Sequence, residues 1–438
     1  MMNHRQIGRL LAVCAAGWAG LARAEGPIEV PLAYQAVGEN SREFYPRGMI
    51  SPELAAAAPE GEWKLPEWTS KHPVFTRIKL GDREHLLVLD VSSPRSKMFD
   101  RLYFDANANR DLTDDPVISG KVEAGYGNQD VEFPPMAVTV ETGGRSLPYR
   151  MRPSIYAYKR GSGETSKAFP RMTIRFMLQT LCYYRGEFEA GGARYRLHLA
   201  DVNANGVFGE AATEPDSGGG RIFMAGDAFY LSTNKPGYYE AMTCGTHWHL
   251  GGQLFAVSLA PGLEKLTLTP AEGPLFPLSF STEPDRIMLF NAGAKQSVAC
   301  FRPGREIRLP AGSYRFADYR LLRKETNGAL WQLLASATTG APPVEVGADR
   351  QAELVLGEPF RPVVEIPEWS RAVKSGNQPV RMSFAIRGAA NEIVNDVSLL
   401  SGQSALTMGK RGARPKEPAY TIATPEGELV QRGSFEYG

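Results

Sequence analysis

Three features of the sequence predict an all-β, multidomain protein. Glycine and proline are abundant, with 45 and 32 among the 438 residues, while aromatic residues make up 10%. From residue 76 onward, apolar runs of four to eight residues alternate with Gly, Pro, Asn and Asp. This mixture is typical of short strands joined by tight turns. The length suits two to four domains, each with its own core.

The first 24 residues have the pattern of a secretory signal peptide. Arg5 and Arg9 precede a short apolar stretch that ends in "ARA" at 22–24. Such an A-x-A motif marks a cleavage site, so the mature chain is expected to begin at Glu25 and to be secreted or periplasmic. Lipidation at Cys14 is the alternative, but the residue before it is not small. No later stretch has the roughly 18 continuous apolar residues of a transmembrane segment.

The mature chain divides by pattern into four parts. Residues 25–75 are Pro-rich and irregular, with one short helix predicted in "SPELAAAAPEGEW", where Ser51 is the N-cap and Pro59 ends the helix. Residues 76–271 contain strand and hairpin patterns such as "FTRIKLGDREHLLVLDV" and "RYRLHLADV". This part is the predicted β-rich region that carries the functional loops described below.

Two small β-sandwiches are predicted at the C-terminus. In residues 272–361, "REIRLPAGSYRFADYRLL" places a Pro-Ala-Gly turn between two alternating strands. Residues 362–438 repeat this pattern, and "TPEG" is typical of a last hairpin turn. Both are expected to be immunoglobulin-like or prealbumin-like.

Charge and cysteine content exclude some functions. The 49 Lys and Arg residues nearly balance the 48 Asp and Glu residues, giving a net charge of +1. We therefore expect neither nucleic acid nor an anionic membrane as partner. The mature chain has Cys182, Cys244 and Cys300, an odd number that allows one disulfide but no disulfide framework.

Two segments carry short oxygen-bearing side chains at every second position. The first loop (105–116) begins "DANANRD", with Asp105, Asn107, Asn109 and Asp111. The second loop (201–212) begins "DVNANG", with Asp201, Asn203 and Asn205. Calcium takes six to eight oxygen ligands, and a loop with ligands at positions 1, 3, 5 and 7 supplies them in a short length. The spacing therefore predicts two calcium sites.

The loops are expected to differ in strength. Gly206 stands at position 6 of the second loop, where the turn favours positive φ, but Arg110 stands there in the first. Both loops lack Glu at position 12. The bidentate ligand must then come from nearby acids, which in the first loop are Asp111, Asp114 or Asp115, and in the second are Glu210, Glu214, Asp216 or Asp227.

The alternative is a pair of metal-free turns. Asp and Asn are common turn residues because their side chains hydrogen-bond the local backbone and they tolerate left-handed conformations. The repetition of the D-x-N-x-N pattern about a hundred residues apart favours the metal.

These loops carry a resemblance. "DVNANGVF" resembles the calcium loop of dockerins and EF-hand proteins, and "RLYFDANANRDLTDD" is similar to a segment of uncharacterised secreted β-rich bacterial proteins. The resemblance covers about two dozen residues and implies calcium-ligand roles for positions 1, 3 and 5 of each loop. The flanks are strand-like where an EF-hand has helices, so neither an opening EF-hand pair nor dockerin-type docking is expected.

Other chemistry has weaker support in the sequence. In "CGTHWHLGG", His247 and His249 would share one face of a strand and, with Cys244, would suit zinc or copper, or they are ordinary strand residues. No nucleophile elbow, metalloprotease motif, P-loop or dinucleotide-binding loop is present. The sequence favours a non-catalytic, extracytoplasmic calcium-binding protein that presents a surface to a polymer or protein partner. The alternative is a secreted glycan or peptide hydrolase with C-terminal accessory sandwiches.

Overall fold

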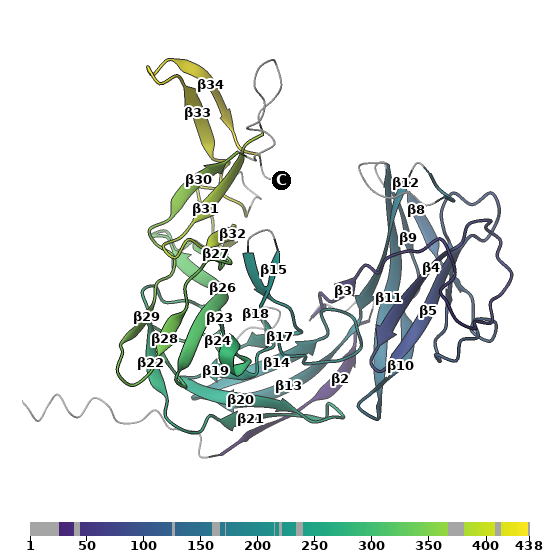
Figure 1. Cartoon of the computed structure of the whole chain (residues 1–438), viewed down its shortest axis with the longest axis horizontal. Coiled ribbons are helices and arrows are strands. Elements are labelled where there is room, and N and C mark those ends of the chain that lie inside the picture. Colours follow the sequence, from purple (N-terminus) through teal and green to yellow (C-terminus); the bar gives the residue numbers. More distant parts are fainter. Residues whose placement is uncertain are drawn as a thin grey trace, which may run out of the picture.

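The computed structural model describes residues 26–38, 44–124, 128–159, 167–170, 172–213, 215–218, 221–233, 240–366, 381–407 and 413–436. Over these residues the chain is all-β, which confirms the predicted fold class. Their one helical element is η1 (Ala292–Ala294), a single 3₁₀ turn. Several sheets share a large apolar core (Figure 1). The predicted signal peptide lies outside the described residues.

Two sheets form an N-terminal β-sandwich. One has the order β4 (Val74–Leu80), β5 (Arg83–Asp90), β6 (Arg101–Phe104), β7 (Ile118–Ser119). The other has the order β3 (Met49–Ile50), β12 (Met172–Thr180), β11 (Arg145–Lys159), β9 (Asn128–Glu132), β8 (Lys121–Ala124), with β10 (Met136–Thr142) also paired to β11. Leu87, Leu89 and Phe176 belong to the shared core, because each strand turns alternate side chains to one face.

A five-stranded sheet follows the sandwich. Its order is β18 (Glu240–Thr243), β17 (Ala228–Ser232), β14 (Ala193–Ala200), β13 (Cys182–Ala190), β2 (Ala33–Ala36). β13 and β14 form a hairpin because Gly191 and Gly192 both adopt the positive φ that a tight two-residue turn requires. On β17, Phe229 stacks on Trp248 of the next sheet, with ring centroids 4.0 Å apart.

The largest sheet has twelve strands and crosses the boundary predicted between residues 271 and 272. Parallel pairing of β19 with β24, where His249 lies opposite Cys300, joins strands on either side of that boundary. The two predicted sandwiches, 272–361 and 362–438, stay predictions as folding units. The order is β1 (Ile28–Pro31), β21 (Lys265–Pro270), β20 (Gln253–Leu259), β19 (His247–Leu250), β24 (Gln296–Phe301), β23 (Arg286–Asn291), β26 (Gly312–Lys324), β27 (Leu330–Ser336), β32 (Ile393–Ser401), β31 (Ser383–Arg387), β30 (Arg361–Glu365), with β28 (Val344–Val346) paired to β26.

Smaller elements complete the C-terminal half. A sheet of β25 (Glu306–Leu309), β22 (Phe276–Phe280) and β29 (Ala352–Leu354) packs on the large sheet and buries Leu278 and Ile307. Two further hairpins are β15 (Pro215–Gly218) with β16 (Arg221–Met224), and β33 (Ala419–Ala423) with β34 (Leu429–Ser434). Beyond Leu356, Ile393 is the one buried apolar side chain among the described residues, so this last part has little core of its own.

The N-terminal segment differs from its prediction. Residues 51–58 are not helical, because Ala55 forms a β-bridge to Phe75 with hydrogen bonds of 2.8 and 2.9 Å in the two directions. This pairing keeps the segment extended beside β4. Residues 25–75 are also less irregular than expected, since β1, β2 and β3 each join a different sheet.

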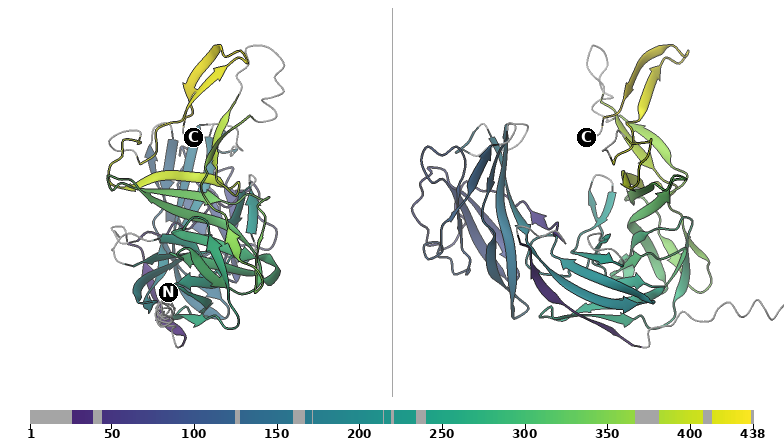
Figure 2. Two further views of the ribbon diagram at one scale, coloured as in Figure 1. Left: turned by 90° about the vertical axis from the view of Figure 1, so that its left-hand side faces the viewer. Right: turned by 180° about the vertical axis from the view of Figure 1, so that it is seen from behind.

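The described strands are arranged as a U (Figure 2). The N-terminal sandwich forms one arm, β13, β14, β20 and β21 form the base, and the strands from β22 onward form the other arm. The β15–β16 hairpin rises from the base on the side of the second arm, where Arg221 bridges to Thr338. The second D-x-N-x-N loop follows β14 in the base.

Candidate metal centres

The second loop lies at the junction of the base and the N-terminal sandwich. β14 leads directly into Asp201, whose side chain has no exposed surface. The fold holds the loop in position through three hydrogen bonds from the sandwich. These run from Met49 N–H to the Val202 carbonyl (3.1 Å), from Gly81 N–H to the Asn205 carbonyl (2.6 Å), and from the Tyr149 hydroxyl to Asp201 Oδ2 (2.8 Å).

Within the second loop, side-chain oxygens accept hydrogen bonds from the loop's own backbone. Asp201 Oδ2 accepts from Gly206 N–H at 2.7 Å, and Oδ1 accepts from Asn205 N–H at 3.3 Å. Asn203 Oδ1 and Asn205 Oδ1 accept from the N–H groups two residues further on, at 3.2 and 2.8 Å. Gly206 has φ 80°, the positive value predicted for position 6, and Ala204 at position 4 has φ 52°. The chain therefore winds around Asp201.

Two further carboxylates approach the second loop. Glu210, at position 10, accepts from the amide nitrogens of Asn203 and Asn205 at 3.0 and 2.6 Å, through the same oxygen Oε2. Asp227, which precedes β17, accepts from Val202 N–H at 3.0 Å and from Glu210 N–H at 3.1 Å. The structure thus brings together both ends of the loop and an acid from a later part of the chain.

Burial leaves Asp201 and Asp227 electrostatically unbalanced. Neither side chain has exposed surface, and their hydrogen-bond donors are backbone N–H groups and the Tyr149 hydroxyl. Loss of solvation raises the pKa of Asp201 to about 6. The same cause, followed by the nearby charge of Asp201, raises the pKa of Asp227 to about 8. A cation here would supply the missing positive charge.

The first loop repeats this geometry 96 positions earlier in the chain. Asp105, also without exposed surface, accepts from Asn109 N–H and Arg110 N–H, both at 3.1 Å. Asn107 Oδ1 accepts from Asn109 N–H at 2.9 Å, and the Asn109 amide nitrogen donates to Asp114 Oδ2 at 2.8 Å. Asp114 therefore occupies the place that Glu210 has in the second loop, at position 10 in both.

The first loop differs from the second at three positions. Arg110 has φ 67°, the left-handed backbone predicted to be strained, and its guanidinium lies over Trp63 at 5.7 Å. Asp111 turns its carboxylate to Lys64 at 2.6 Å, and this hydrogen bond lowers the pKa of Asp111 to about 2. Burial raises the pKa of Asp115, whose Oδ2 has no partner among the described residues.

The structure narrows the choice among the predicted acids. Asp114 and Glu210 reach their loops from position 10, and Asp227 reaches the second loop from outside it, whereas the Asp111 side chain pairs with Lys64. Asp216 lies on β15, and Glu214 is outside the described residues. Sequence reasoning missed Tyr149 and Gly48, which pack on Asp201 from distant strands and have no local signal in the sequence.

The donors in both loops are oxygens of carboxylate and amide groups. Such oxygens suit a hard cation such as calcium rather than zinc or copper. Groups of three or more His, Cys, Asp or Glu side chains in metal-binding geometry are absent from the described residues. Asn supplies two of the three alternating side chains in each loop, so these loops fall outside that definition.

The predicted histidine pair gains no third ligand in the described structure. On β19, His247 is half-buried and His249 is 2% exposed, with Nδ1 of His249 unpartnered among the described residues. Cys244 is buried and reduced, as are Cys182 and Cys300. Burial lowers the pKa of His249 to about 4. The pair therefore behaves as part of the core.

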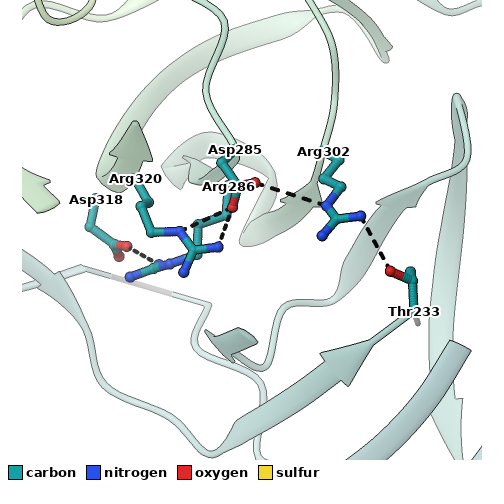
Figure 3. A network of polar contacts seen from close by, with 6 residues as sticks. All are labelled: Thr233, Asp285, Arg286, Arg302, Asp318 and Arg320. Atoms are coloured by element: carbon teal, nitrogen blue, oxygen red, sulfur yellow. Dashed lines mark hydrogen bonds and ion pairs between the residues drawn. The ribbon is translucent and has the colours of Figure 1, made fainter. Parts of the chain in front are cut away.

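A second polar cluster, on the other arm, shows a balanced arrangement. Arg320 is buried beside Asp285, and its Nε donates to Oδ2 at 3.0 Å. Because guanidinium groups neutralise these carboxylates, the cluster has the character of a structural ion-pair network. The remaining contacts are Arg286 to Asp318 (2.6 Å), Arg302 to Asp285 (3.9 Å) and Arg302 to Thr233 (3.2 Å), as Figure 3 shows.

Comparisons with protein-family models, curated proteins and solved structures give no match. In the described part of the chain, no helix combines the length and the apolar character needed to cross a bilayer. Function must therefore be argued from the residues of the site themselves.

Proposed function

We propose that this chain is a non-catalytic, extracytoplasmic protein that calcium stabilises and that presents a surface to a polymer or protein partner. The observation that carries the calcium proposal is the buried pair Asp201 and Asp227. Two buried carboxylates near one another are costly unless a cation balances them. The second loop surrounds one of them with further oxygen donors.

The residues that would hold calcium follow from the loop positions. In the second loop they are the side chains of Asp201, Asn203, Asn205 and Glu210, with the Val207 carbonyl at position 7. In the first loop they are the side chains of Asp105, Asn107, Asn109 and Asp114, with the Asp111 carbonyl. Each amide oxygen keeps a second lone pair beside its backbone hydrogen bond. Bound calcium would supply charge and rigidity.

The burial of the acids favours this function over hydrolysis. Asp201 and Asp227 have no exposed surface, so a polymeric substrate would have no access to them. General acid–base catalysis requires the carboxyl group within hydrogen-bonding reach of the reacting atoms. Two cavities of the described structure are lined mainly by residues 281–323 and 382–436, away from both loops.

The expected affinity fits the expected location. Loops that lack the bidentate Glu at position 12 resemble weaker sites, and extracellular modules bind calcium at about 10⁻⁴–10⁻³ M. Calcium at ten times its Kd would stabilise the fold by about 1.4 kcal/mol through one site. Such a site serves structure outside the cytoplasm better than signalling inside it.

Calorimetric titration of the chelator-treated chain lacking residues 1–24 tests the proposal. We expect two calcium sites, a raised melting temperature in millimolar calcium, and weaker binding of magnesium, which demands closer octahedral geometry. Asp105→Ala combined with Asp201→Ala should abolish both effects. An unchanged melting temperature at millimolar calcium would refute the proposal.

A further inference from the structure

The large sheet opens between its strands β31 and β32. The two strands pair only where Arg387 lies opposite Ile393, next to the turn that joins them. Away from that turn, β31 pairs with β30 on its outer side and β32 pairs with β27. The inner edges, 383–386 and 394–397, therefore face each other without a strand-to-strand ladder between them.

A cavity of about 870 Å³ lies between these two edges. Residues 382–386 form one wall and residues 394–397 form the other. The C-terminal segment closes it: Leu399 N–H donates to the Ala413 carbonyl at 2.7 Å, and Phe435 N–H donates to the Pro418 carbonyl at 2.9 Å. Since alternate backbone N–H and C=O groups of a strand point to each side, both walls direct hydrogen-bonding groups into this groove.

The side chains of the groove are aromatic and cationic. Phe435 lies between Phe384 and Tyr420, with ring centroids 5.4 and 5.1 Å away. The charged lining residues are Arg221, Arg414 and Lys416 against Asp396 and Glu436. Asp396 already accepts hydrogen bonds from Ser398 at 2.7 Å and from Gln332 at 3.4 Å. The groove thus presents an excess of positive charge.

We propose that the groove between β31 and β32 binds an extended, acidic peptide segment of a partner protein by strand addition. The proposal deepens the proposed binding function and is independent of calcium. The peptide backbone would pair with one or both open edges, apolar side chains would pack on Phe384 and Phe435, and carboxylates would face Lys416 and Arg414. Each wall offers about four residues, so a segment of roughly four to six residues fits.

Open strand edges favour a peptide over a glycan. A glycan has no regular series of N–H and C=O groups to complete a ladder, whereas an added strand satisfies the edge groups in register. The near absence of buried apolar side chains in β30 to β34 agrees with this view, because the region has surface left to bury.

Fluorescence anisotropy with a labelled peptide, Thr-Val-Glu-Val-Glu-Thr, tests the proposal on the chain lacking residues 1–24. We expect saturable binding that is at least about tenfold weaker when alternate peptide nitrogens are methylated, because methylation removes the donors of the ladder. Lys416→Glu should weaken this peptide and strengthen one with Lys in place of Glu. The matched control is Lys79→Glu, an exposed lysine on β4, which should change neither.

Three results would overturn the proposal. They are no saturable binding of the peptide, equal binding of the methylated peptide, and displacement of the peptide by maltohexaose, which would indicate a glycan site instead. The titration is repeated in calcium and in chelator. Peptide binding that persists while the loops bind no calcium would separate the fate of this proposal from that of the calcium proposal.

Discussion

Replacing Gly48 with alanine should damage the junction that holds the second loop. Gly48 is buried against Asp201, and a Cβ atom at this position would overlap the Asp201 carbonyl oxygen and lie 2.8 Å from Thr180 Oγ1. The obstacle is backbone, which cannot move aside as a flexible side chain can. Relief would require Gly48 and Asp201 to separate.

The separation would cost two backbone hydrogen bonds. These run from Thr180 N–H to the Gly48 carbonyl at 2.9 Å and from Met49 N–H to the Val202 carbonyl at 3.1 Å. At about 1 kcal/mol each, with a further 1–2 kcal/mol for residual strain, the free energy of unfolding should fall by about 3–4 kcal/mol. The calcium heat of the second loop should fall as well, because Asp201 moves.

Urea unfolding of Gly48→Ala beside Gly38→Ala measures this effect. Gly38 is exposed, has no atom within 4 Å of the added Cβ, and does not need positive φ, so its substitution should change stability by less than about 0.5 kcal/mol. A loss below 1 kcal/mol for Gly48→Ala would show that the close approach to Asp201 is not as described.

Three further predictions concern the loops and the buried polar groups. Asp201→Ala should remove more calcium-dependent stabilisation than Asp105→Ala, because the second loop has the larger buried charge to balance; equal losses in calorimetry would contradict this. Burial holds the pKa of His249 near 4 against 6.5 when unfolded, so the unfolded chain binds the proton first and stability is lost as pH falls from 6.5 toward 4, by about 2 kcal/mol at pH 5. His249→Asn should flatten the stability profile over that range, and an unchanged slope would exclude His249 as its source. Glu392→Leu should cost about 2–4 kcal/mol in urea unfolding, because it leaves the Tyr319 hydroxyl and Gly357 N–H without their shared acceptor; a neutral result would mean that water or the backbone replaces it.

Local patterns in the sequence predicted what depends on local geometry. The fold class followed from alternating strands and turn residues, and the left-handed backbone at Arg110 and Gly206 followed from loop position alone. The loop's internal hydrogen bonds have the same origin, because each joins residues no more than five positions apart. Positions 4, 6 and 10 behave alike in the two loops despite different residues.

Long-range contacts account for what the sequence did not predict. Residues 51–58 have the composition of a short helix, but Ala55 pairs with Phe75, and tertiary pairing outweighs a weak local preference. Nothing near Asp201 indicates that Tyr149 or Gly48 approaches it. The parallel pairing of β19 with β24 is likewise set by the fold, since the loop between parallel strands leaves no turn signature.

The pairing of the first strands with much later ones has a consequence for how the chain folds. Ile28 of β1 lies opposite Leu268, and Ala36 of β2 lies opposite Cys182. During synthesis, the segment 28–36 must wait for its partners until most of the molecule has been made. Loop closure over such separations is slow, so we expect a high contact order and slow refolding. Until then β1 and β2 are exposed edges, and this delay makes them natural points of contact for a chaperone.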